Sequence, residues 1–479
     1  MKYTPSRQKK LNESNYKDYT LDFQPISNSH GSVQFFDHSQ NKKLTIGINV
    51  DDIEFKYRVK AEFPPIVADL IDIAVAIYTS DRLASQSLTG KQRRFHVILP
   101  VRNPELLSAE PFLAKLDDLL EWTTDSKWVF DFQKRIAPKR LVEHQSLPLV
   151  PQGCEVTLWS GGLDALAGLY TRLLMYPEKR FILFGTGSNN SVYARQKRVY
   201  EEIQSIFPGR CQLFRLRIQF DDSSKQPKNK LSRARGVVFT LLGSACAYLM
   251  GEKVLCLYEN GIGAINLPYR ESAVGLDHSR SVHPLTLAKV SNLVSELLGE
   301  EFQVKNPFLF WTKAEMCKAL AKNGQDNLPT LTMSCDSPHR QKVSPQCGYC
   351  SSCLLRRQSL AASAIKDRTR YVVLHGERPV KDPSLCFLNM QAQVRTLDSL
   401  FAVSNEPWIT LTKKFPVLDD IVDRTAMAEN LLPADMRSRL IQLYQNYVSE
   451  WNTVESQIAN GLLSDQKASS KYVVSSQQS

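Results

Sequence analysis

The sequence predicts an α/β protein with a parallel-sheet domain over residues 151–370, an N-terminal α+β region over residues 1–150 and a helical C-terminal region over residues 371–479. Between residues 154 and 299, apolar strand-like runs alternate with helical runs, which is typical of a parallel sheet with helices on both faces. The N-terminal region lacks this rhythm, and residues 384–460 have mainly helical spacing.

The composition suits a globular protein of two or three domains. The chain has 479 residues, of which 43% are hydrophobic and 23% are charged. The formal net charge of +11 favours an anionic partner such as a nucleotide or nucleic acid, although the basic residues are spread along the chain. The polar N-terminus lacks the apolar core of a signal peptide, and the longest nearly uncharged run, 236–251, is too short to span a bilayer. We therefore expect a cytoplasmic protein that does not bind membranes.

In the N-terminal region, residues 1 to about 20 look loose, and the Pro-rich stretch 147–153 is the expected linker to the next domain. The apolar residues after Pro64 have helical spacing, and proline is common at the start of a helix, so we expect a long helix there. The expected strands are 44–50, 53–59, 93–101 and 127–132, and the expected helices are 64–83 and 104–123.

In the parallel-sheet domain, each expected strand is followed by a helix. The strands are expected at 154–160, 180–187, 211–220 and 253–261, and the helices at 163–176, 193–207, 234–252 and 285–299. The polar tail from about residue 464 is expected to be disordered.

A small-residue turn joins the first of these strands to its helix. Ser160, Gly161 and Gly162 form the turn, and Asp164 follows in the first turn of the helix. Helix N-termini bind anions through their unpaired N–H groups, and glycines let the backbone approach a phosphate. Ser160 is suited to cap the helix, and Asp164 could help to hold Mg²⁺. The turn lacks the lysine of a Walker A loop and the spacing of a dinucleotide fingerprint. The alternative interpretation is a turn that only lets the helix pack on the strand.

Four of the ten cysteines lie between residues 335 and 353, and none precedes Cys154. This distribution indicates reduced thiols and a metal site rather than a disulfide scaffold. The C-x₂-C steps of Cys335, Cys347, Cys350 and Cys353 suit one tetrahedral Zn²⁺, and we expect Cys353 to begin a helix. His339 could replace Cys335, and an iron–sulfur cluster would accept the same cysteines. The other six are expected to be ordinary core thiols: Cys154, Cys211, Cys246, Cys256, Cys317 and Cys386.

The Ser-Gly-Gly-Leu-Asp turn resembles the PP-loop of the N-type ATP pyrophosphatases, and with the downstream cysteines the chain resembles the QueC family of 7-cyano-7-deazaguanine synthases. Residues 312–320, TKAEMCKAL, resemble the family's helix before the cysteines. Arg235 and Arg356 match arginines of two further family patterns. The resemblance covers about residues 153–370.

The resemblance implies an ATP-dependent reaction on 7-carboxy-7-deazaguanine. The carboxylate is adenylated, ammonia displaces AMP to give an amide, and a second ATP activates the amide for dehydration to the nitrile. The zinc would be structural. The residues that the resemblance assigns are Ser160, Asp164, Arg235 and Lys313 for catalysis, Ser160, Gly161, Gly162, Leu163 and Asp164 for ATP and Mg²⁺, and Glu259, Asn260 and Arg270 for the substrate.

Several of these residues have plainer alternatives. Arg235 could be a surface salt-bridge residue and Lys313 a lysine on a helix surface. Glu259 and Asn260 follow the fourth strand, where ligands of open α/β sheets bind. They could equally well form only a turn.

The sequence departs from the family pattern at three places. Ala165 replaces a Ser or Thr, so that one hydroxyl contact worth roughly 1.5–3 kcal/mol is missing and the pyrophosphate would be held more weakly or differently. Gly236 replaces an Asn. Segment 268–283 matches the family's substrate loop poorly, and its polar residues could replace substrate contacts: Arg270, Asp277, His278 and Arg280.

The flanking regions resemble those of long QueC-like proteins in bacterial antiphage gene clusters of the Qat type. This resemblance implies a defence role and a protein partner from the same cluster, whose amine could replace ammonia. Two other functions fit the sequence. The positive charge favours a tRNA-modifying PP-loop enzyme, and Ala165 would fit a non-catalytic nucleotide-binding subunit of a defence complex.

Overall fold

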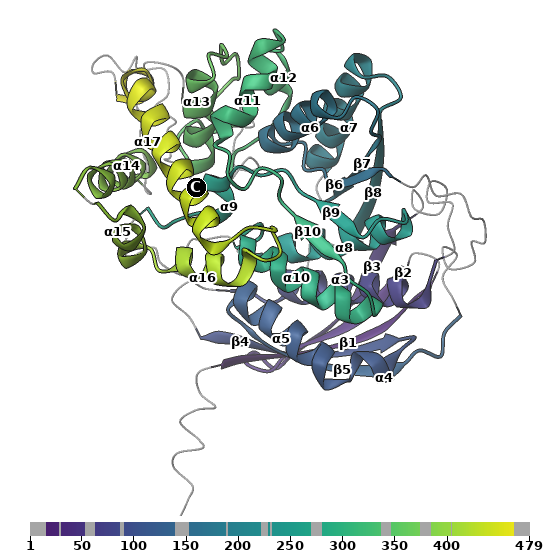
Figure 1. The fold of residues 1–479 in the computed structure, drawn as a ribbon. Coiled ribbons are helices and arrows are strands. Elements are labelled where there is room, and N and C mark those ends of the chain that lie inside the picture. Colours follow the sequence, from purple (N-terminus) through teal and green to yellow (C-terminus); the bar gives the residue numbers. More distant parts are fainter. Residues whose placement is uncertain are drawn as a thin grey trace, which may run out of the picture.

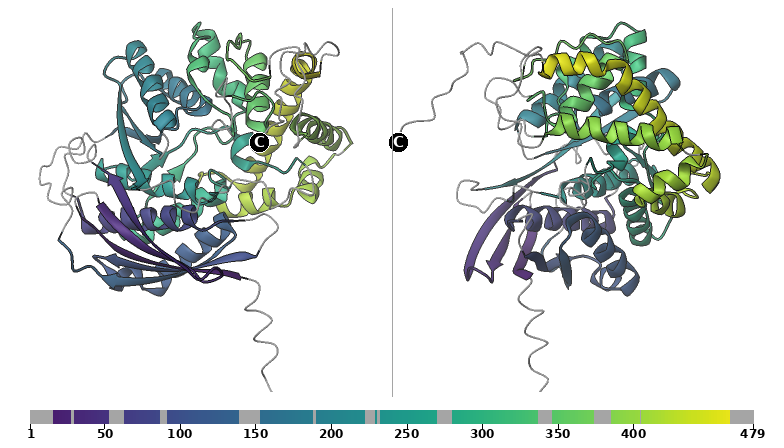
Figure 2. Two further views of the ribbon diagram at one scale, coloured as in Figure 1. Left: turned by 180° about the vertical axis from the view of Figure 1, so that it is seen from behind. Right: turned by 90° about the vertical axis from the view of Figure 1, so that its left-hand side faces the viewer.

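The computed structural model describes most of the chain, namely residues 16–27, 30–52, 63–86, 91–138, 153–187, 190–221, 229, 232–269, 280–336, 346–373, 385–403 and 405–463. Figures 1 and 2 show a mixed α/β arrangement in which the N-terminal strands lie below the parallel strands and the C-terminal helices lie along one side.

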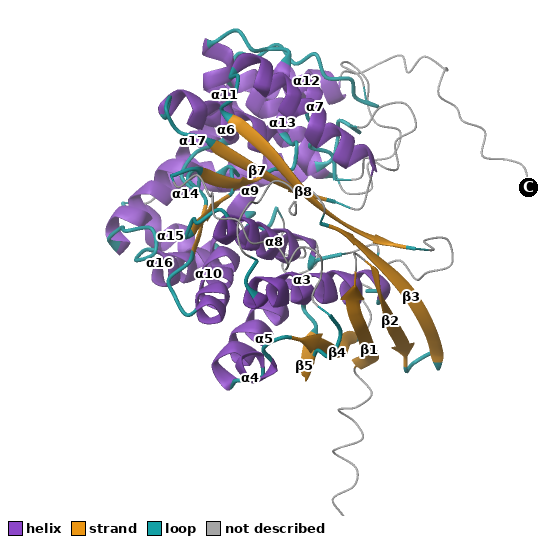
Figure 3. Ribbon diagram, turned by 90° about the vertical axis from the view of Figure 1, so that its right-hand side faces the viewer, coloured by secondary structure: helices purple, strands orange, loops and turns teal. Residues whose placement is uncertain are grey.

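A ten-stranded sheet joins the N-terminal and central parts, in the order β10-β9-β6-β7-β8-β3-β2-β1-β4-β5. Figure 3 shows β3 next to β8, where the two parts meet. The N-terminal strands are β1 (Tyr16–Ser27), β2 (His30–Asp37), β3 (Lys42–Asp51), β4 (Gln92–Val101) and β5 (Lys127–Lys134). The central strands are β6 (Glu155–Leu158), β7 (Phe181–Thr186), β8 (Cys211–Phe220), β9 (Val254–Cys256) and β10 (Gln303–Lys305).

The central strands are parallel, as the alternating sequence predicts. In chain order, β6, β7 and β8 extend the sheet in one direction, and β9 and β10 extend it in the other. The order therefore reverses between β6 and β9. In open α/β sheets, ligands bind beyond the carboxyl ends of the strands at such a reversal.

The N-terminal strands continue the same sheet. β3 pairs antiparallel with β8, with Ile48 opposite Phe220. β2 and β3 are antiparallel neighbours, whereas β4 and β5 run parallel to β1. The predicted domain boundary at residue 150 lies outside the described residues and stays a prediction.

Helices cover both faces of the central strands. The N-terminal and central helices are α3 (Pro65–Leu83), α4 (Pro104–Leu107), α5 (Glu110–Thr124), α6 (Leu163–Met175), α7 (Asn190–Ile206), α8 (Arg235–Leu249), α9 (Gly261–Ile265), α10 (Pro284–Leu298), α11 (Lys313–Lys322), α12 (Leu328–Leu331) and α13 (Ser351–Ala362). Helices α3, α5, α8 and α10 share one large apolar core with the N-terminal strands, and α6, α7 and α11 form a second core on the other face.

The C-terminal part is helical, as predicted. Its helices are α14 (Cys386–Val403), α15 (Pro407–Lys414), α16 (Val417–Thr425) and α17 (Pro433–Leu463). They form a third core with residues of α9 and α13, so that the C-terminal helices are packed onto the central domain. None of the described helices is both long and apolar enough to cross a membrane.

Some predicted elements were wrong in detail. Residues 16–20 are not loose, because the alternating side chains of Tyr19, Leu21 and Phe23 are buried along β1. Strand β2 was not predicted, because polar residues lie between its buried positions. The helix expected at 104–123 is divided into α4 and α5, and the strand expected at 253–261 is only three residues long. The strand expected at 53–59 and the tail from 464 lie outside the described residues.

The N-terminal region fixes the beginning of α8 through the buried carboxylate of Asp81. This group forms a 2.8 Å ion pair with Arg93 and accepts hydrogen bonds from the Ser232 hydroxyl and the Ala234 backbone N–H, at 2.8 and 3.2 Å. Both members of the ion pair have fully buried side chains.

We expect Asp81→Ala to lower the free energy of unfolding by about 3–5 kcal/mol, because Arg93 would remain buried without its partner. The control is Asp18→Ala, which removes the exposed ion pair with Arg94 and should cost about 0–1 kcal/mol. Denaturant unfolding measures both values. Equal effects would contradict this account of the α8 anchor.

Candidate active site

The turn after β6 is held in place from two sides. The backbone N–H of Trp159 donates to the carbonyl of Phe184 at 2.7 Å, and its buried indole N–H donates to the carbonyl of Gln196 at 2.9 Å. Gly161 has a φ of +71°, and a Cβ there would lie 3.3 Å from the backbone of Gln196. Glycine is needed at this position both for the left-handed backbone and for the close approach of α7.

The first turn of α6 is not capped by a side chain. Its N-cap is Gly162, so the expectation that Ser160 caps the helix was wrong. The exposed Ser160 hydroxyl instead accepts a 3.1 Å hydrogen bond from the N–H of Gly162. The helix starts at the buried Leu163, and its N-terminal N–H groups give this end the partial positive charge that attracts anions.

Asp164 lies in this first turn and receives two hydrogen bonds from other elements. Its Oδ2 is 2.7 Å from Nζ of Lys313, and its Oδ1 accepts from Nδ2 of Asn260 at 2.9 Å. The Lys313 and Asp164 side chains are only 6% and 13% exposed. Lys313 is therefore not on a helix surface, although the sequence left that alternative open.

Local structure positions both partners of Asp164. Lys313 is the first residue of α11, and Thr312 and Glu315 form a reciprocal capping box there. Asn260 is the N-cap of α9, and its Oδ1 accepts from the N–H of Gly263 at 2.8 Å.

Glu259 completes the cluster. Its Oε1 accepts from Nδ2 of Asn260 at 2.8 Å, and its backbone carbonyl accepts from Nδ2 of Asn306 at 2.7 Å. Burial and the charge of Asp164 raise the pKa of Glu259 to about 8, against the opposing effect of Lys313. Burial disfavours the charged form of Lys313, but Asp164 and Glu259 outweigh it and raise the pKa of this lysine.

The cluster of Asp164, Glu259, Asn260 and Lys313 therefore lies at the reversal of the strand order. Asp164 follows β6, and Glu259 and Asn260 follow β9. The fold thus brings together the glycine turn, the N-terminus of α6, two carboxylates and a lysine. These groups could bind a polyphosphate and a divalent cation.

A basic group that was not predicted lies beside the turn. The backbone of Arg195 on α7 lies against Gly161, and its side-chain Nε has no hydrogen-bond partner among the described residues. Burial and the charges of Arg198 and Arg356 lower the pKa of Arg195. The Arg356 guanidinium is fully buried and donates to protein groups, so the positive charge that suits an anion here is that of Arg195 and Arg198. Arginines spaced along α7 look like an ordinary solvated helix face in the sequence.

Two predicted arginines, Arg235 and Arg280, are not part of the cluster. Arg235 is exposed in the first turn of α8, whereas Asp164 lies in the first turn of α6. Arg280 donates to the carbonyl of Trp122 at 2.6 Å and lies over its ring, so this arginine is held by α5. A Cβ at Gly236 would lie 2.1 Å from Cβ of Ser281, so this position has no room for a larger residue. Arg270, Asp277, His278 and His339 lie outside the described residues.

The four predicted cysteines converge. The sulfur atoms of Cys335, Cys347, Cys350 and Cys353 all lie within 4.8 Å of one another, and Cys347 and Cys353 are 3.9 Å apart. Tetrahedral Zn²⁺ with Zn–S bonds of about 2.3 Å requires sulfur separations of about 3.8 Å, so the cluster fits zinc. Hydrogen bonding with the neighbouring thiols lowers the pKa of Cys335. The expected start of the helix was wrong by two residues, since α13 begins at Ser351 with Cys350 as its N-cap.

Two buried arginines attach the cysteine cluster to its surroundings. Arg356 donates to the carbonyl of Pro329 at 2.6 Å and to the Thr332 hydroxyl at 2.7 Å. Arg357 donates to the carbonyl of Gly348 at 3.1 Å. The carbonyl of Met333 would lie 3.4 Å from a Cβ on Gly162. The chain leading to the cysteines thus lies against the turn that begins at Ser160.

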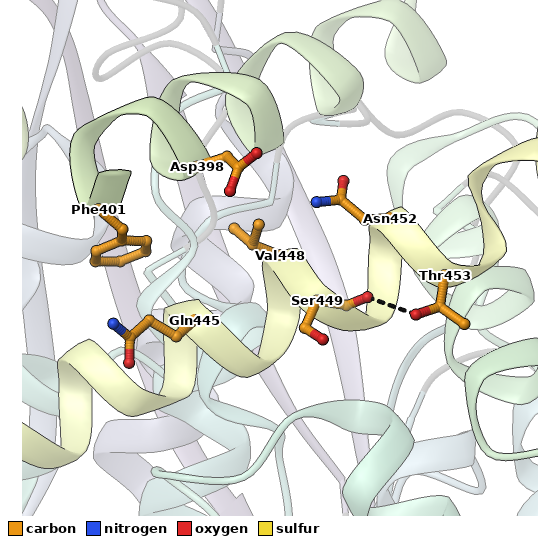
Figure 4. Close-up of a pocket in the computed structure, with 7 residues that line it drawn as sticks. All are labelled: Asp398, Phe401, Gln445, Val448, Ser449, Asn452 and Thr453. Carbon is orange, nitrogen blue, oxygen red and sulfur yellow. Dashed lines mark hydrogen bonds between the residues drawn. The ribbon is translucent and has the colours of Figure 1, made fainter. Parts of the chain in front are cut away.

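A surface pocket of about 520 Å³ lies elsewhere, between α14 and α17 (Figure 4). Its lining is mainly polar and contains none of the candidate residues: Asp398, Phe401, Gln445, Val448, Ser449, Asn452 and Thr453. The chemistry of the candidate site therefore does not extend to this pocket.

Comparison with known proteins supports the resemblance. The family model described as "Queuosine biosynthesis protein QueC" matches residues 282–364. The chain is homologous to the QueC family over part of its length. This QueC-matched segment contains Lys313 and the four cysteines, whereas Ser160–Asp164 and Glu259 precede it.

Similar proteins of known function belong to the same family as the matching model. The chain is 31% identical over 119 residues to the 7-cyano-7-deazaguanine synthase of Ralstonia nicotianae, covering 24% of this chain and 51% of that protein. It is 27% identical over 142 residues to that of Coxiella burnetii, covering 29% of this chain and 57% of that protein. For Pseudomonas fluorescens the identity is 29% over 143 residues, with coverage of 29% and 55%. The chain thus spans about half the length of these relatives.

We expect the purified protein to contain about one zinc per chain and Cys347→Ser to lose it, because a structural site needs all four ligands. Cys386→Ser, at a half-buried cysteine outside the cluster, is the control. Elemental analysis measures both. Iron in place of zinc, or full zinc in Cys347→Ser, would refute the assignment.

We also expect a pH effect from Glu259. Because its pKa in the folded state is raised to about 8, the stability it contributes is present below the ordinary carboxyl range and is lost as the pH rises through about 8. Glu259→Gln should therefore flatten the fall in the free energy of unfolding between about pH 5 and 8. Burial also raises the pKa of Glu450, to about 7, so the relevant quantity is the difference between wild type and variant. Parallel profiles would contradict the burial of a neutral Glu259, and Glu121→Gln, at an exposed ion pair, is the control.

Proposed function

We propose that this chain is an ATP-dependent synthase that adenylates the carboxylate of a 7-deazaguanine-type base and converts it to an amide or nitrile. The observation that carries the proposal is the Asp164–Lys313–Asn260–Glu259 cluster beside the Ser160 turn. Homology to 7-cyano-7-deazaguanine synthases, over about half their length, supports the same reaction.

In this proposal the Ser160 turn is a PP-loop that binds the β- and γ-phosphates of ATP. The open N–H groups of α6 and the Arg195 guanidinium carry positive charge toward the phosphates. The substrate carboxylate attacks the α-phosphorus, the bond to the bridging oxygen breaks, and pyrophosphate leaves with the electron pair. The role of Arg195 is to stabilise the charge that develops on this leaving group.

Lys313 is proposed to face the α-phosphate. Its ion pair with Asp164 holds the ammonium group in place before the reaction, so that little reorganisation is needed when charge develops. Ammonia then attacks the acyl carbon and AMP leaves. The amide oxygen then attacks the α-phosphorus of a second ATP and a second pyrophosphate leaves. Loss of AMP, with the oxygen, and of the two amide protons gives the nitrile.

Asp164 and Glu259 are the residues proposed to hold Mg²⁺. Oxygen ligands from two carboxylates suit this ion, which would neutralise phosphate charge when bound. Glu259 must lose its proton to serve as a ligand, and the raised pKa of its carboxyl group makes this step dependent on pH. The Cys335 cluster is proposed to have a structural role, because it supports the segment next to Gly162.

We place the reaction in a bacterial antiphage system of the Qat type, on the resemblance of the flanking regions. A protein partner's amine would then replace ammonia, and the reaction would end at a secondary amide without the nitrile step. Intact-mass spectrometry of co-expressed partners tests this part, and an unchanged partner mass with every candidate would refute it.

The central test is incubation of the protein with ATP, Mg²⁺ and 7-carboxy-7-deazaguanine. We expect AMP and pyrophosphate, with a base whose mass shows an amide or nitrile. Lys313→Ala should lower kcat/KM by about 10²–10³, a typical loss for one preorganised charge. Lys318→Ala, on the exposed side of the same helix, is its control. Arg195→Ala should weaken inhibition by added pyrophosphate, with the exposed Lys197→Ala as control.

Three results of these experiments would contradict the proposed function. Absence of AMP with this acid, but AMP formation on addition of tRNA, would favour the tRNA-modifying alternative. ATP binding without any turnover would favour the non-catalytic subunit. Full activity in Lys313→Ala would remove the ion pair from the mechanism.

A further inference from the structure

We propose that α17 is an integral part of the candidate active site: it fixes the starts of α9 and α11, which carry the two partners of Asp164. The catalytic consequence rests on the proposed function, whereas the structural consequence does not. Helix α17 begins at Pro433, well beyond the QueC-matched segment. Figure 1 shows it running across α9 and beside α13.

The first contact is with the capping box of α11. Glu450 accepts a 2.6 Å hydrogen bond from the Thr312 hydroxyl. One turn earlier on α17, Asn446 donates to Oε1 of Glu315 at 3.0 Å. Both members of the capping box are therefore held by α17. Lys313 directly follows Thr312 in the chain, and its ammonium group is paired with Asp164.

The second contact is with the start of α9. A Cβ at Gly261 would lie 2.5 Å from Cδ2 of Leu443 and 2.0 Å from the carbonyl of Leu309. The N–H of Gly261 donates to the carbonyl of Trp311 at 2.9 Å. Gly261 therefore lies between α17 and the chain that leads into α11. It directly follows Asn260, the other partner of Asp164.

Residues at regular intervals along α17 thus contact the two helix starts that carry the partners of Asp164. Leu443 contacts the α9 start, and Asn446 and Glu450 contact the α11 start. The side chains of Tyr444, Tyr447 and Trp451 are buried in the C-terminal core, and this packing holds α17 in place. The Gln393 side chain of α14 adds hydrogen bonds to the carbonyls just after α9, at 3.0 and 3.1 Å.

This arrangement makes Glu450 and Asn446 positioning residues. They touch neither Asp164 nor Asn260 directly, and they act through Thr312 and Glu315. A shift of about 1 Å at a catalytic group can cost about 10²-fold in rate. The C-terminal helices therefore set the geometry of the cluster rather than forming a separate module.

The test is the double variant Asn446→Ala/Glu450→Ala, examined by hydrogen–deuterium exchange and by kinetics. We expect amide exchange in residues 312–322 to accelerate at least about tenfold, because the capping box loses both external partners. We expect kcat to fall by at least about tenfold while the KM for ATP changes little. Glu450→Gln, which keeps an acceptor for Thr312, should retain most of the wild-type behaviour. Asn452→Ala, on the exposed side of α17, is the control.

The two readouts separate the two proposals. Faster exchange without any synthase activity in the wild type would refute the proposed function and leave the structural role of α17 intact. Unchanged exchange with unchanged kcat would overturn the role of α17. A loss of kcat with equal loss in Asn452→Ala, or with zinc loss, would also overturn it, because the effect would then be general destabilisation.

Discussion

The buried ion pair between Lys313 and Asp164 is the interaction on which the site depends. It joins the first turns of α11 and α6, which lie about 150 residues apart in the chain and meet at the reversal of the strand order. Breaking a buried pair typically costs about 3–5 kcal/mol, because the remaining charge has no partner. The pair can persist because Asn260 donates to the second oxygen of Asp164 and the capping box fixes the backbone of Lys313.

The regions outside the QueC-matched segment pack against the central strands and helices rather than forming separate modules. On the N-terminal side, β3 extends the sheet beyond β8 and Asp81 fixes the start of α8. On the C-terminal side, α17 contacts α9 and α11. The cysteine cluster reaches the turn at Gly162 through Met333. Helix α17 and the segment before the cysteines therefore both limit the freedom of the site, which is what preorganised electrostatic catalysis requires.

Much of the central domain could be predicted from the sequence, because each buried parallel strand and its helix leave a local pattern. The metal site could also be predicted, because the short C-x₂-C spacings bring thiols close together. The strands β1 and β2 were missed because polar residues alternate with the buried Tyr19, Leu21 and Phe23. Ser160 was expected as the helix cap because it is the residue type that caps, whereas the backbone starts the helix two residues later.

The remaining site residues depend on tertiary contacts that leave no local signal. Arg195 is distinguished only by its approach to Gly161, and Glu450 only by its bond to Thr312 across 138 residues of sequence. The burial of Lys313 is likewise a property of the packed domain.

The most direct measurement is a crystal structure with Mg²⁺ and a non-hydrolysable ATP analogue. We expect the β- and γ-phosphates on the N–H groups of residues 161–164, a cation at Asp164 and the Lys313 ammonium within hydrogen-bond distance of the α-phosphate. A triphosphate bound at any other place, with the Asp164–Lys313 pair untouched, would contradict it.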